Sequence, residues 1–235
     1  YTLYQSLEEN CDDFHIYAFS LNEMDTKNIF KEKKNITFIN LHDLETKYNE
    51  LYYAKKNRTT VEYYFTLTPF TCRYIFDIFN LDQITYLDSD LFFFKNPKDL
   101  YNYINEQNHE IFITEHSNKK FEKKYGRFNV GWIVFLNTQN SKKCLEDWGN
   151  DCINWCFDEI NEEKFADQKY LDTWEKNYEK VFIVKKYLVN IGPWNIDKLN
   201  NSNIDNLICY HFHNLNIFYK NLFITNISSF FTFNK

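Results

Sequence analysis

Glycine, proline and methionine are scarce in this 235-residue chain, which has 4, 3 and 1 of them. This scarcity excludes collagen-like and linker-rich sequences, and no internal repeat or low-complexity segment is present. No run of 18 apolar residues occurs, so the sequence holds no candidate for a membrane-spanning helix. The chain begins at Tyr1 without a signal-peptide pattern, and we expect that its front is truncated.

The spacing Cys-x-x-Cys, common in zinc and redox sites, is also absent although the chain has 6 cysteines. Most of them stand among apolar neighbours. We therefore expect reduced core cysteines, in preference to disulfides or zinc ligands, and a cytoplasmic protein. The cysteines are Cys11, Cys72, Cys144, Cys152, Cys156 and Cys209.

Basic residues are outnumbered, with 27 Lys and Arg against 33 Asp and Glu, which gives a net charge of −6 and a pI near 5.6. This balance argues against nucleic acid as the main partner. What the chain has in abundance is apolar surface, since 44% of its residues are hydrophobic and 20% are aromatic. A folded protein is expected, and its length suits a single domain over residues 1–235.

Strand-like and helix-like segments alternate along the chain. A charged helix over 23–34 lies between two short strand-like runs, and this βαβ pattern predicts an α/β fold with a mainly parallel sheet flanked by helices. Thr68-Pro69 reads as a helix start, 121–127 as a basic linker and 165–174 as a helix. We expect strands at 14–19, 36–39, 84–87, 110–114, 128–136, 181–184 and 207–210, and a helix at 1–9.

The segment ITYLDSDLFFFKNP, residues 84–97, places Asp88 and Asp90 directly after a strand-like run. In extended backbone, residues two apart point to the same side, so both carboxylates would face one point at the mouth of the sheet. Their mutual repulsion calls for a compensating cation, and Mn²⁺ or Mg²⁺ bound to substrate phosphates would supply it. An Asp-x-Asp also arises by chance at about this frequency, so its placement carries the argument.

Two further polar pairs follow apolar segments: Asp167 with Gln168, and His211 with His213. Open α/β sheets bind ligands at the carboxyl ends of their strands, so these pairs are expected to meet the aspartates. Because the last strand ends at His211, we expect only one of the two imidazoles to reach the cation. Gly131 inside the run 128–136 indicates close approach of a ligand or of backbone.

Six segments together resemble the GT-A glycosyltransferases, and specifically bacterial nucleotide-diphospho-sugar transferases related to glycosyltransferase family 8. They occur in the family's order and cover most of the chain. The segments are NRTTVEYYFTLTP (57–69), YLDSDLFFFKNP (86–97), GRFNVGWIVFLN (126–137), FADQKYLDTW (165–174), GPWN (192–195) and YHFHNL (210–215). The resemblance implies a Rossmann-like sheet whose first strand is missing from this chain.

The resemblance also implies site residues. Asp88 and Asp90 would bind Mn²⁺ or Mg²⁺ on the donor diphosphate, with His213 as the third protein ligand. Ser89, Asn129 and Arg58 would contact the donor, and Asp167 with Gln168 would lie beside the reacting sugar. Asn214 departs from the family, which usually has glycine after the second histidine, so the backbone approach there differs.

The function expected from this resemblance is transfer of a sugar, with retention, from a nucleotide-diphosphate-sugar to a hydroxyl of a glycan or glycoconjugate. A UDP-sugar is the expected donor. Two alternatives remain open: a non-catalytic nucleotide-sugar-binding module, and a metal-dependent phosphohydrolase, since the same groups could activate water. The segment 216–235 is rich in phenylalanine and could pack on the domain, meet a partner, or bring the protein to the inner face of the membrane. The sequence does not indicate an oligomeric state.

Overall fold

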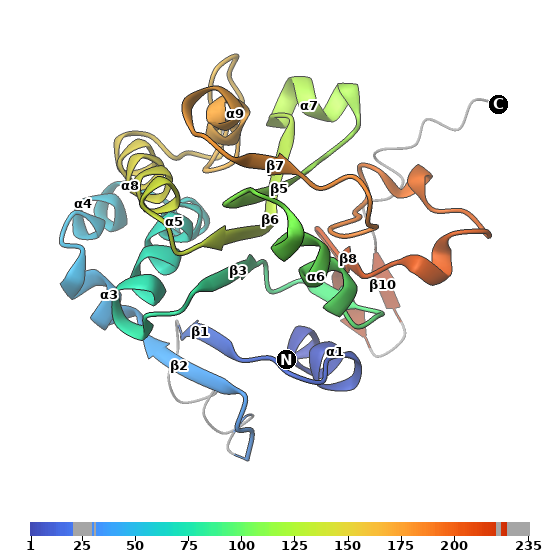
Figure 1. The fold of residues 1–235 in the computed structure, drawn as a ribbon. Helices are drawn as coiled ribbons and strands as arrows, with labels where there is room; N and C mark the ends of the chain where they lie inside the picture. Colours follow the sequence, from blue (N-terminus) through green and yellow to red (C-terminus); the bar gives the residue numbers. More distant parts are fainter. Residues whose placement is uncertain (21–29, 31, 220–221, 225–235) are drawn as a thin grey trace.

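The computed structural model describes residues 1–20, 30, 32–219 and 222–224. Its centre is a four-stranded sheet in the order β3-β6-β5-β7, in which β6 pairs with β3 along one edge and with β5 along the other (Figure 1). The β3–β6 and β5–β6 pairs are antiparallel, and the β5–β7 pair is parallel. The strands are β3 (Gln83–Leu87), β5 (Ile111–Glu115), β6 (Phe128–Leu136) and β7 (Val181–Ile183).

Three smaller pairings complete the strands. A parallel pair joins β1 and β2, and an antiparallel pair joins β4 to β8. The third is an antiparallel hairpin near the end of the described chain. These strands are β1 (Ile16–Ser20), β2 (Ile36–Asn40), β4 (Leu91–Phe93), β8 (Cys209–His211), β9 (Asn216–Tyr219) and β10 (Leu222–Ile224).

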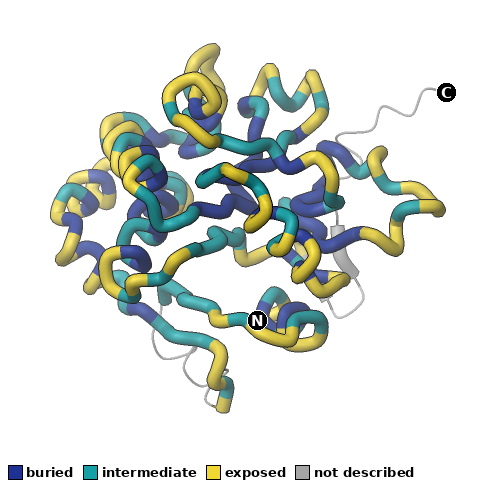
Figure 2. Tube along the Cα trace, viewed as in Figure 1, coloured by how far each residue is buried: buried dark blue, intermediate teal, exposed yellow. Residues whose placement is uncertain are grey.

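Helices cover both faces of the central sheet. One hydrophobic cluster joins the sheet to α5 and α8, and a second joins its other face to α1, α6 and the β4–β8 pair. Figure 2 shows the buried strands at the centre and the exposed residues on the outer turns of the helices. The helices are α1 (Thr2–Asn10), α3 (Leu41–Lys47), α4 (Leu51–Asn57), α5 (Thr60–Phe79), α6 (Lys98–Glu106), α7 (Lys119–Tyr125), α8 (Gln139–Asn154) and α9 (Trp174–Asn177).

This architecture confirms the predicted α/β class, with a mixed sheet flanked by helices. The parallel share is smaller than expected, because both pairings of β6 are antiparallel. Within the described residues, β1 pairs only with β2, and β3 pairs only with β6. A cleft runs between β1 and β3, and both strands are only half buried throughout.

An irregularity in the β5–β6 pairing changes which side chains of β6 face which layer. Phe128 and Val130 face α5 and α8, as do Ile133 and Phe135, so the alternation slips by one residue in between. The register moves two residues along β5 and five along β6 at this point, and an odd number of extra residues in one strand changes which face the residues on either side of it point to. As a result, Asn129 and Gly131 both face β8.

Several predicted boundaries were wrong, and each has a local cause. The helix expected to start at Thr68 begins at Thr60, because Thr59 and Glu62 form a capping box, and Pro69 lies inside the helix. The segment 121–127 contains most of a short helix, which the Asn118 side chain caps. Residues 169–173 form a 3₁₀ turn, not part of a longer α-helix.

The prediction of reduced core cysteines is confirmed, whereas two other predicted segments lie largely outside the described residues. All six cysteines are free thiols, and five of them are buried. Among the described residues, no helix is both long and apolar enough to cross a bilayer. Most of the helix predicted over 23–34 and the last residues of the phenylalanine-rich segment, 225–235, lie outside the described residues.

Candidate functional site

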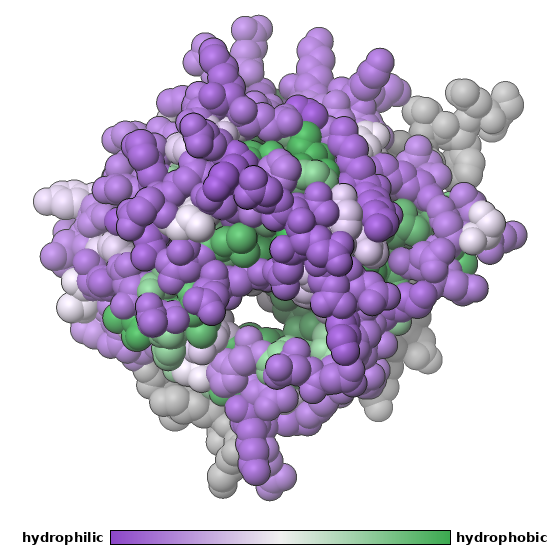
Figure 3. All heavy atoms as spheres, in the orientation of Figure 1, coloured by the Kyte–Doolittle hydropathy of each residue, from purple (hydrophilic) through white to green (hydrophobic). Residues whose placement is uncertain are grey.

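A cleft of ≈ 1810 Å³ opens at the ends of β3 and β6 and continues between β3 and β1. Figure 3 shows this face hollowed between the two layers, with hydrophobic atoms lining the opening. The volume exceeds the 300–1,000 Å³ that is typical for one small ligand, so it has room for two. Asp88, Ser89, Asp90, Asn129, Asp167, Gln168, His211 and His213 all line this cleft, together with His116 and Trp194.

The two aspartates lie in the tight turn that follows β3. The backbone N–H of Asp88 donates to the carbonyl of Gly131, which continues the β3–β6 pairing by one residue. On the other side of the turn, the N–H of Phe212 donates to the carbonyl of Asp90. The turn is therefore fixed at both ends by backbone, and it presents both carboxylates to the cleft.

The β4–β8 pair brings a histidine to these carboxylates. Leu91 lies opposite His211 in the register, and the His211 side chain is 3% exposed. Its Nε2 atom is 3.0 Å from Oδ1 of Asp90 and 3.6 Å from Oδ2 of Asp88. Donor atoms at adjacent corners of an octahedron with metal–oxygen bonds of 2.0–2.1 Å are about 3 Å apart, so Nε2 of His211 and Oδ1 of Asp90 have the spacing of two ligands of one cation, whereas Oδ2 of Asp88 lies farther away.

His213 lies at the edge of the same cluster. One donor atom from each of Asp90, His211 and His213 can be chosen so that all three lie within 4.8 Å of one another. The Nε2 atom of His213 also lies 2.8 Å from the Asn214 side-chain amide, which is exposed. The resemblance assigns the third ligand to His213, whereas the buried imidazole that contacts both carboxylates is His211.

The charges in this cluster shift one another's pKa values. Burial raises the pKa of Asp88, although the His211 charge opposes this effect. Burial acts the same way on Asp90, but the hydrogen bond and charge of His211 outweigh it and lower the pKa of Asp90. Burial alone would lower the pKa of His211, yet its hydrogen bond to Asp90 and the two carboxylates raise it. A proton on His211 thus does in part what a cation would do.

Asp167 lies on the floor of the cleft, 4% exposed, after a residue with left-handed backbone, Ala166 (φ 46°). The Trp148 indole donates to the Asp167 carbonyl and holds this turn against α8. Burial raises the pKa of the Asp167 carboxyl to about 7, with a further rise from the charge of Asp88. A carboxyl that exchanges its proton near neutral pH is a candidate for catalytic chemistry.

Gln168 and Asn129 are joined by a hydrogen bond. The Asn129 amide nitrogen donates to the Gln168 side-chain oxygen at 3.1 Å, and the Gln168 amide donates to the Tyr125 carbonyl at 2.9 Å. The Asn129 oxygen accepts from the N–H of Gly131 at 2.9 Å. Both amides are therefore held rigidly at the wall of the cleft next to Asp167.

An aromatic group also lines the cleft. Trp194 packs edge-on against His116 and His211, each with ring centroids 5.1 Å apart, and also contacts Phe121 and His213. Burial lowers the pKa of His116 to about 3, so this ring is neutral. The sequence reading quoted Trp194 in a matching segment but gave it no role, and it did not consider His116.

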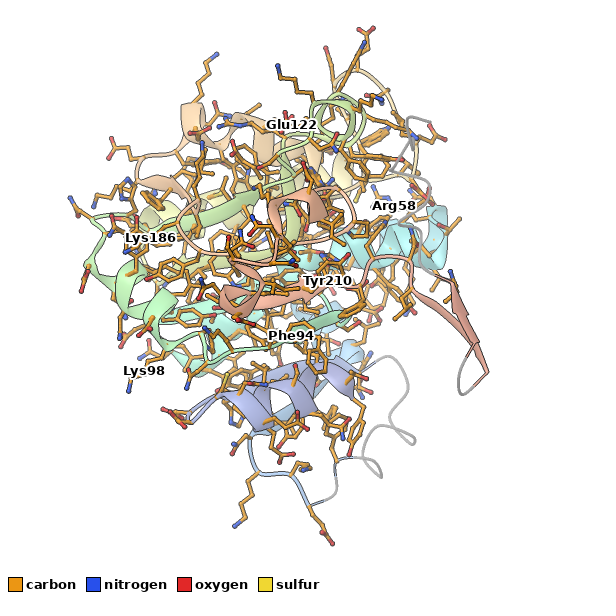
Figure 4. All side chains as sticks on the ribbon, turned by 90° about the vertical axis from the view of Figure 1, so that its right-hand side faces the viewer. Arg58, Phe94, Lys98, Glu122, Lys186 and Tyr210 are labelled. Carbon is orange, nitrogen blue, oxygen red and sulfur yellow. The ribbon has the colours of Figure 1, made fainter. Side chains whose placement is uncertain are left out.

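Arg58 was predicted to contact the donor, and this prediction is corrected because Arg58 does not line the cleft. Its guanidinium donates to the Thr66 hydroxyl and the Ile153 carbonyl, and it packs over the Phe157 ring. It thus joins α4 and α5 to α8. In Figure 4, Arg58 lies beside the cyan helices, whereas Tyr210, the neighbour of His211, belongs to the strand β8. The charge of Arg58, in the matching segment 57–69, suggested a ligand for phosphate, but in the structure this side chain holds helices together.

Gly131 lies directly under the His211 ring. A Cβ atom at this position would lie 2.4 Å from Cε1 of His211, which is closer than atoms can approach. We expect Gly131→Ala to displace this ring, lower the free energy of unfolding by about 1–3 kcal/mol and weaken Mn²⁺ binding. Urea unfolding and calorimetry measure the two effects.

The matched control is Gly149→Ala in α8, where the nearest atoms are 3.3 Å away and belong to side chains of Arg73 and Phe70. Alanine favours a helix over glycine by about 1 kcal/mol, so this variant should unfold at a similar or higher urea concentration and bind Mn²⁺ normally. Equal Mn²⁺ binding by Gly131→Ala and wild type would contradict the placement of His211.

No protein-family model matches this chain. Among curated proteins, the uncharacterized protein YfnD of Bacillus subtilis (strain 168) is 31% identical over 226 residues, which cover 88% of this chain and 70% of YfnD. The chain belongs to the same family as YfnD. A second relative in that strain, the uncharacterized protein YfnF, is 30% identical over 205 residues, covering 82% of this chain and 66% of YfnF.

Solved structures with a similar fold are glycosyltransferases. Mouse xyloside xylosyltransferase 1 superimposes with a TM-score of 0.56 at 16% identity, over 89% of both chains. The bifunctional glycosyltransferase WbbM gives 0.53 at 11% identity, over 90% of this chain and 43% of that one. GlyE of Streptococcus pneumoniae TIGR4 gives 0.51 at 15%, over 89% and 50%. This chain therefore has a GT-A-like fold. The narrower relation to family 8 stays a prediction.

Proposed function

We propose that this protein is a metal-dependent glycosyltransferase that moves a sugar from a nucleotide-diphosphate-sugar, with a UDP-sugar as first candidate, to a hydroxyl of a glycan or glycoconjugate. One observation carries the proposal. A carboxylate–imidazole cluster with the spacing of cation ligands and a buried carboxyl whose pKa is raised to about 7 line the same cleft. The GT-A-like fold supports it as analogy.

The cation end of the cleft would bind the donor diphosphate. Asp90 would supply an oxygen donor and His211 and His213 nitrogen donors, and the Asp88 carboxylate lies 3.6 Å from Nε2 of His211, close enough to approach the same cation. Hard oxygen ligands with imidazole suit Mn²⁺ or Mg²⁺. Such a cation, when bound, supplies Lewis acidity for the leaving diphosphate. Ser89 is exposed between the two aspartates, where it could contact the donor.

The sugar end of the cleft would hold the reacting carbon. Asn129 and Gln168 present amide groups of fixed orientation that can hydrogen-bond sugar hydroxyls. Positive charge that develops on the sugar ring favours the ionised form of Asp167, which then stabilises that charge. We propose retention of configuration, with the acceptor hydroxyl entering from the side on which the diphosphate leaves and giving its proton to a phosphate oxygen.

The two alternatives predict different chemistry. A binding module does not need a buried carboxyl with a raised pKa, because burying an ionisable group without a partner destabilises the fold. A phosphohydrolase would place its attacking water near the carboxylates and would not use the amide groups beside Asp167. The glycosyltransferase uses both ends of the cleft and is therefore the reading that we favour.

A donor screen tests the proposal. UDP-, GDP- and TDP-sugars are added with Mn²⁺, and we expect one of them to raise the melting temperature, because a ligand that binds only the folded state stabilises it. With the same donor, slow hydrolysis should release nucleoside diphosphate and free sugar. Release of inorganic phosphate would favour the phosphohydrolase, binding without any turnover would favour the binding module, and no stabilisation by any donor would reject the nucleotide-sugar site.

A further inference from the structure

A buried asparagine next to β8 connects the two ends of the cleft. Asn190 is 1% exposed and has left-handed backbone (φ 55°). Its side-chain nitrogen lies 2.8 Å from both Oγ1 of Thr114 and Oδ1 of Asn129. Its side-chain oxygen lies 3.0 Å from Nδ1 of His211. All polar atoms of the Asn190 amide are thus satisfied in the interior.

The orientation of these amides follows from a backbone group that can only donate. The N–H of Gly131 lies 2.9 Å from one side-chain atom of Asn129, which must therefore be the oxygen. The Asn190 atom that faces this oxygen must be the amide nitrogen. The other Asn190 atom is then the oxygen, and it faces His211. An amide oxygen accepts only, so the hydrogen lies on Nδ1 of His211.

This placement determines which nitrogen of His211 is free. We propose that Asn190 is a positioning residue that holds His211 with its hydrogen on Nδ1, so that the Nε2 lone pair points toward Asp90, where the cation of the proposed function would bind. A partner on the distal ring nitrogen fixes the tautomer and the ring orientation of metal-binding histidines in general. Asn190 is thus needed for His211 to act as a ligand.

Asp90 favours the opposite tautomer, since it would accept a hydrogen from Nε2. The Asp90 side chain is 43% exposed and can turn to water, whereas the oxygen of Asn190 is enclosed and has no other donor among the described residues. An unsatisfied buried acceptor costs about 1–3 kcal/mol. The hydrogen bond between Nδ1 of His211 and the buried oxygen of Asn190 therefore determines the tautomer of the neutral ring. The proposed tautomer of His211 does not depend on the proposed function. Only its expected effect on metal binding rests on the cation site of that function.

The test compares Asn190→Gly with Asn80→Gly. Both positions have left-handed backbone, which glycine adopts without strain. Asn80, however, is the C-cap residue of α5 and lies on the surface. In ¹⁵N NMR of the metal-free protein, at a pH where the ring is neutral, His211 should carry its hydrogen on Nδ1 in wild type and Asn80→Gly. In Asn190→Gly the hydrogen should move to Nε2, and the affinity for Mn²⁺ should fall by about 10–100-fold.

The variant Asn190→Asp keeps an acceptor for Nδ1–H, so it should keep the wild-type tautomer, but it loses the N–H donors to Thr114 and Asn129 and should lower the free energy of unfolding. A wild-type His211 with its hydrogen on Nε2 would overturn the proposal, even if Asn190→Gly does not fold. An unchanged tautomer in folded Asn190→Gly would overturn it as well. Failure of wild type to bind Mn²⁺ would count against the cation site instead, since the tautomer is measured without metal.

Discussion

Asp90→Asn is expected to abolish Mn²⁺-dependent binding of a nucleotide sugar while the fold stays intact. The amide has the shape of the carboxylate, but it removes a full negative charge and one of the oxygen donors nearest to Nε2 of His211. The Asp90 side chain is 43% exposed, so its loss changes the free energy of unfolding by roughly 1 kcal/mol or less. Calorimetry with Mn²⁺ and the donor from the screen should show at least about 10²-fold weaker binding.

Activity should fall further than binding, by about 10²–10³-fold, since the lost charge supports the leaving diphosphate mainly in the transition state. The matched control is Asp205→Asn, at an exposed carboxylate on a surface turn, which should bind and react like wild type. Unchanged Mn²⁺-dependent binding by Asp90→Asn would remove Asp90 from the cation site and with it the central part of the proposed function.

Strands with strong apolar patterns could be predicted from the sequence, because their local composition leaves few alternatives. The predicted run 128–136 matches β6 residue for residue, and the run before Asp88 matches β3 within one residue. The bulge in β6 could not be predicted, although it is what turns Asn129 and Gly131 toward β8. It depends on how β6 pairs with β5, and pairing between distant strands is not encoded in either strand alone.

The same limit separates the residues of the candidate site whose positions could be inferred from those whose positions could not. Asp88 and Asp90 follow a recognisable strand, so their position could be inferred. The choice between His211 and His213 depends on the register of β4 against β8, which places His211 opposite Leu91. For Asn190 the sequence holds no indication, since its role comes from three partners in distant segments, Thr114, Asn129 and His211. Arg58 gave a misleading one, because its partners on α5 and α8 appear only in the fold.

Asp167→Asn is expected to lose activity and gain stability. The carboxyl is 4% exposed and its pKa is raised to about 7, so the folded protein binds a proton that the unfolded chain has released. As the pH rises from about 4 to 7, the unfolded state is therefore favoured by up to about 4 kcal/mol. Asparagine fills the same space without this ionisation. Above about pH 7 the metal-free variant should melt roughly 5–10 °C higher than wild type.

The direction of this pH dependence is the sharp part of the prediction. Below about pH 4 the wild-type carboxyl is protonated in both states, so the stability difference from Asp167→Asn should shrink toward zero. Asp197→Asn, at an exposed carboxylate, provides the baseline. Turnover should fall by about 10²–10³-fold if Asp167 stabilises charge at the sugar. A variant that is destabilised at every pH would show that Asp167 is a structural residue, whereas stability gained together with activity lost is the combination expected of a catalytic site.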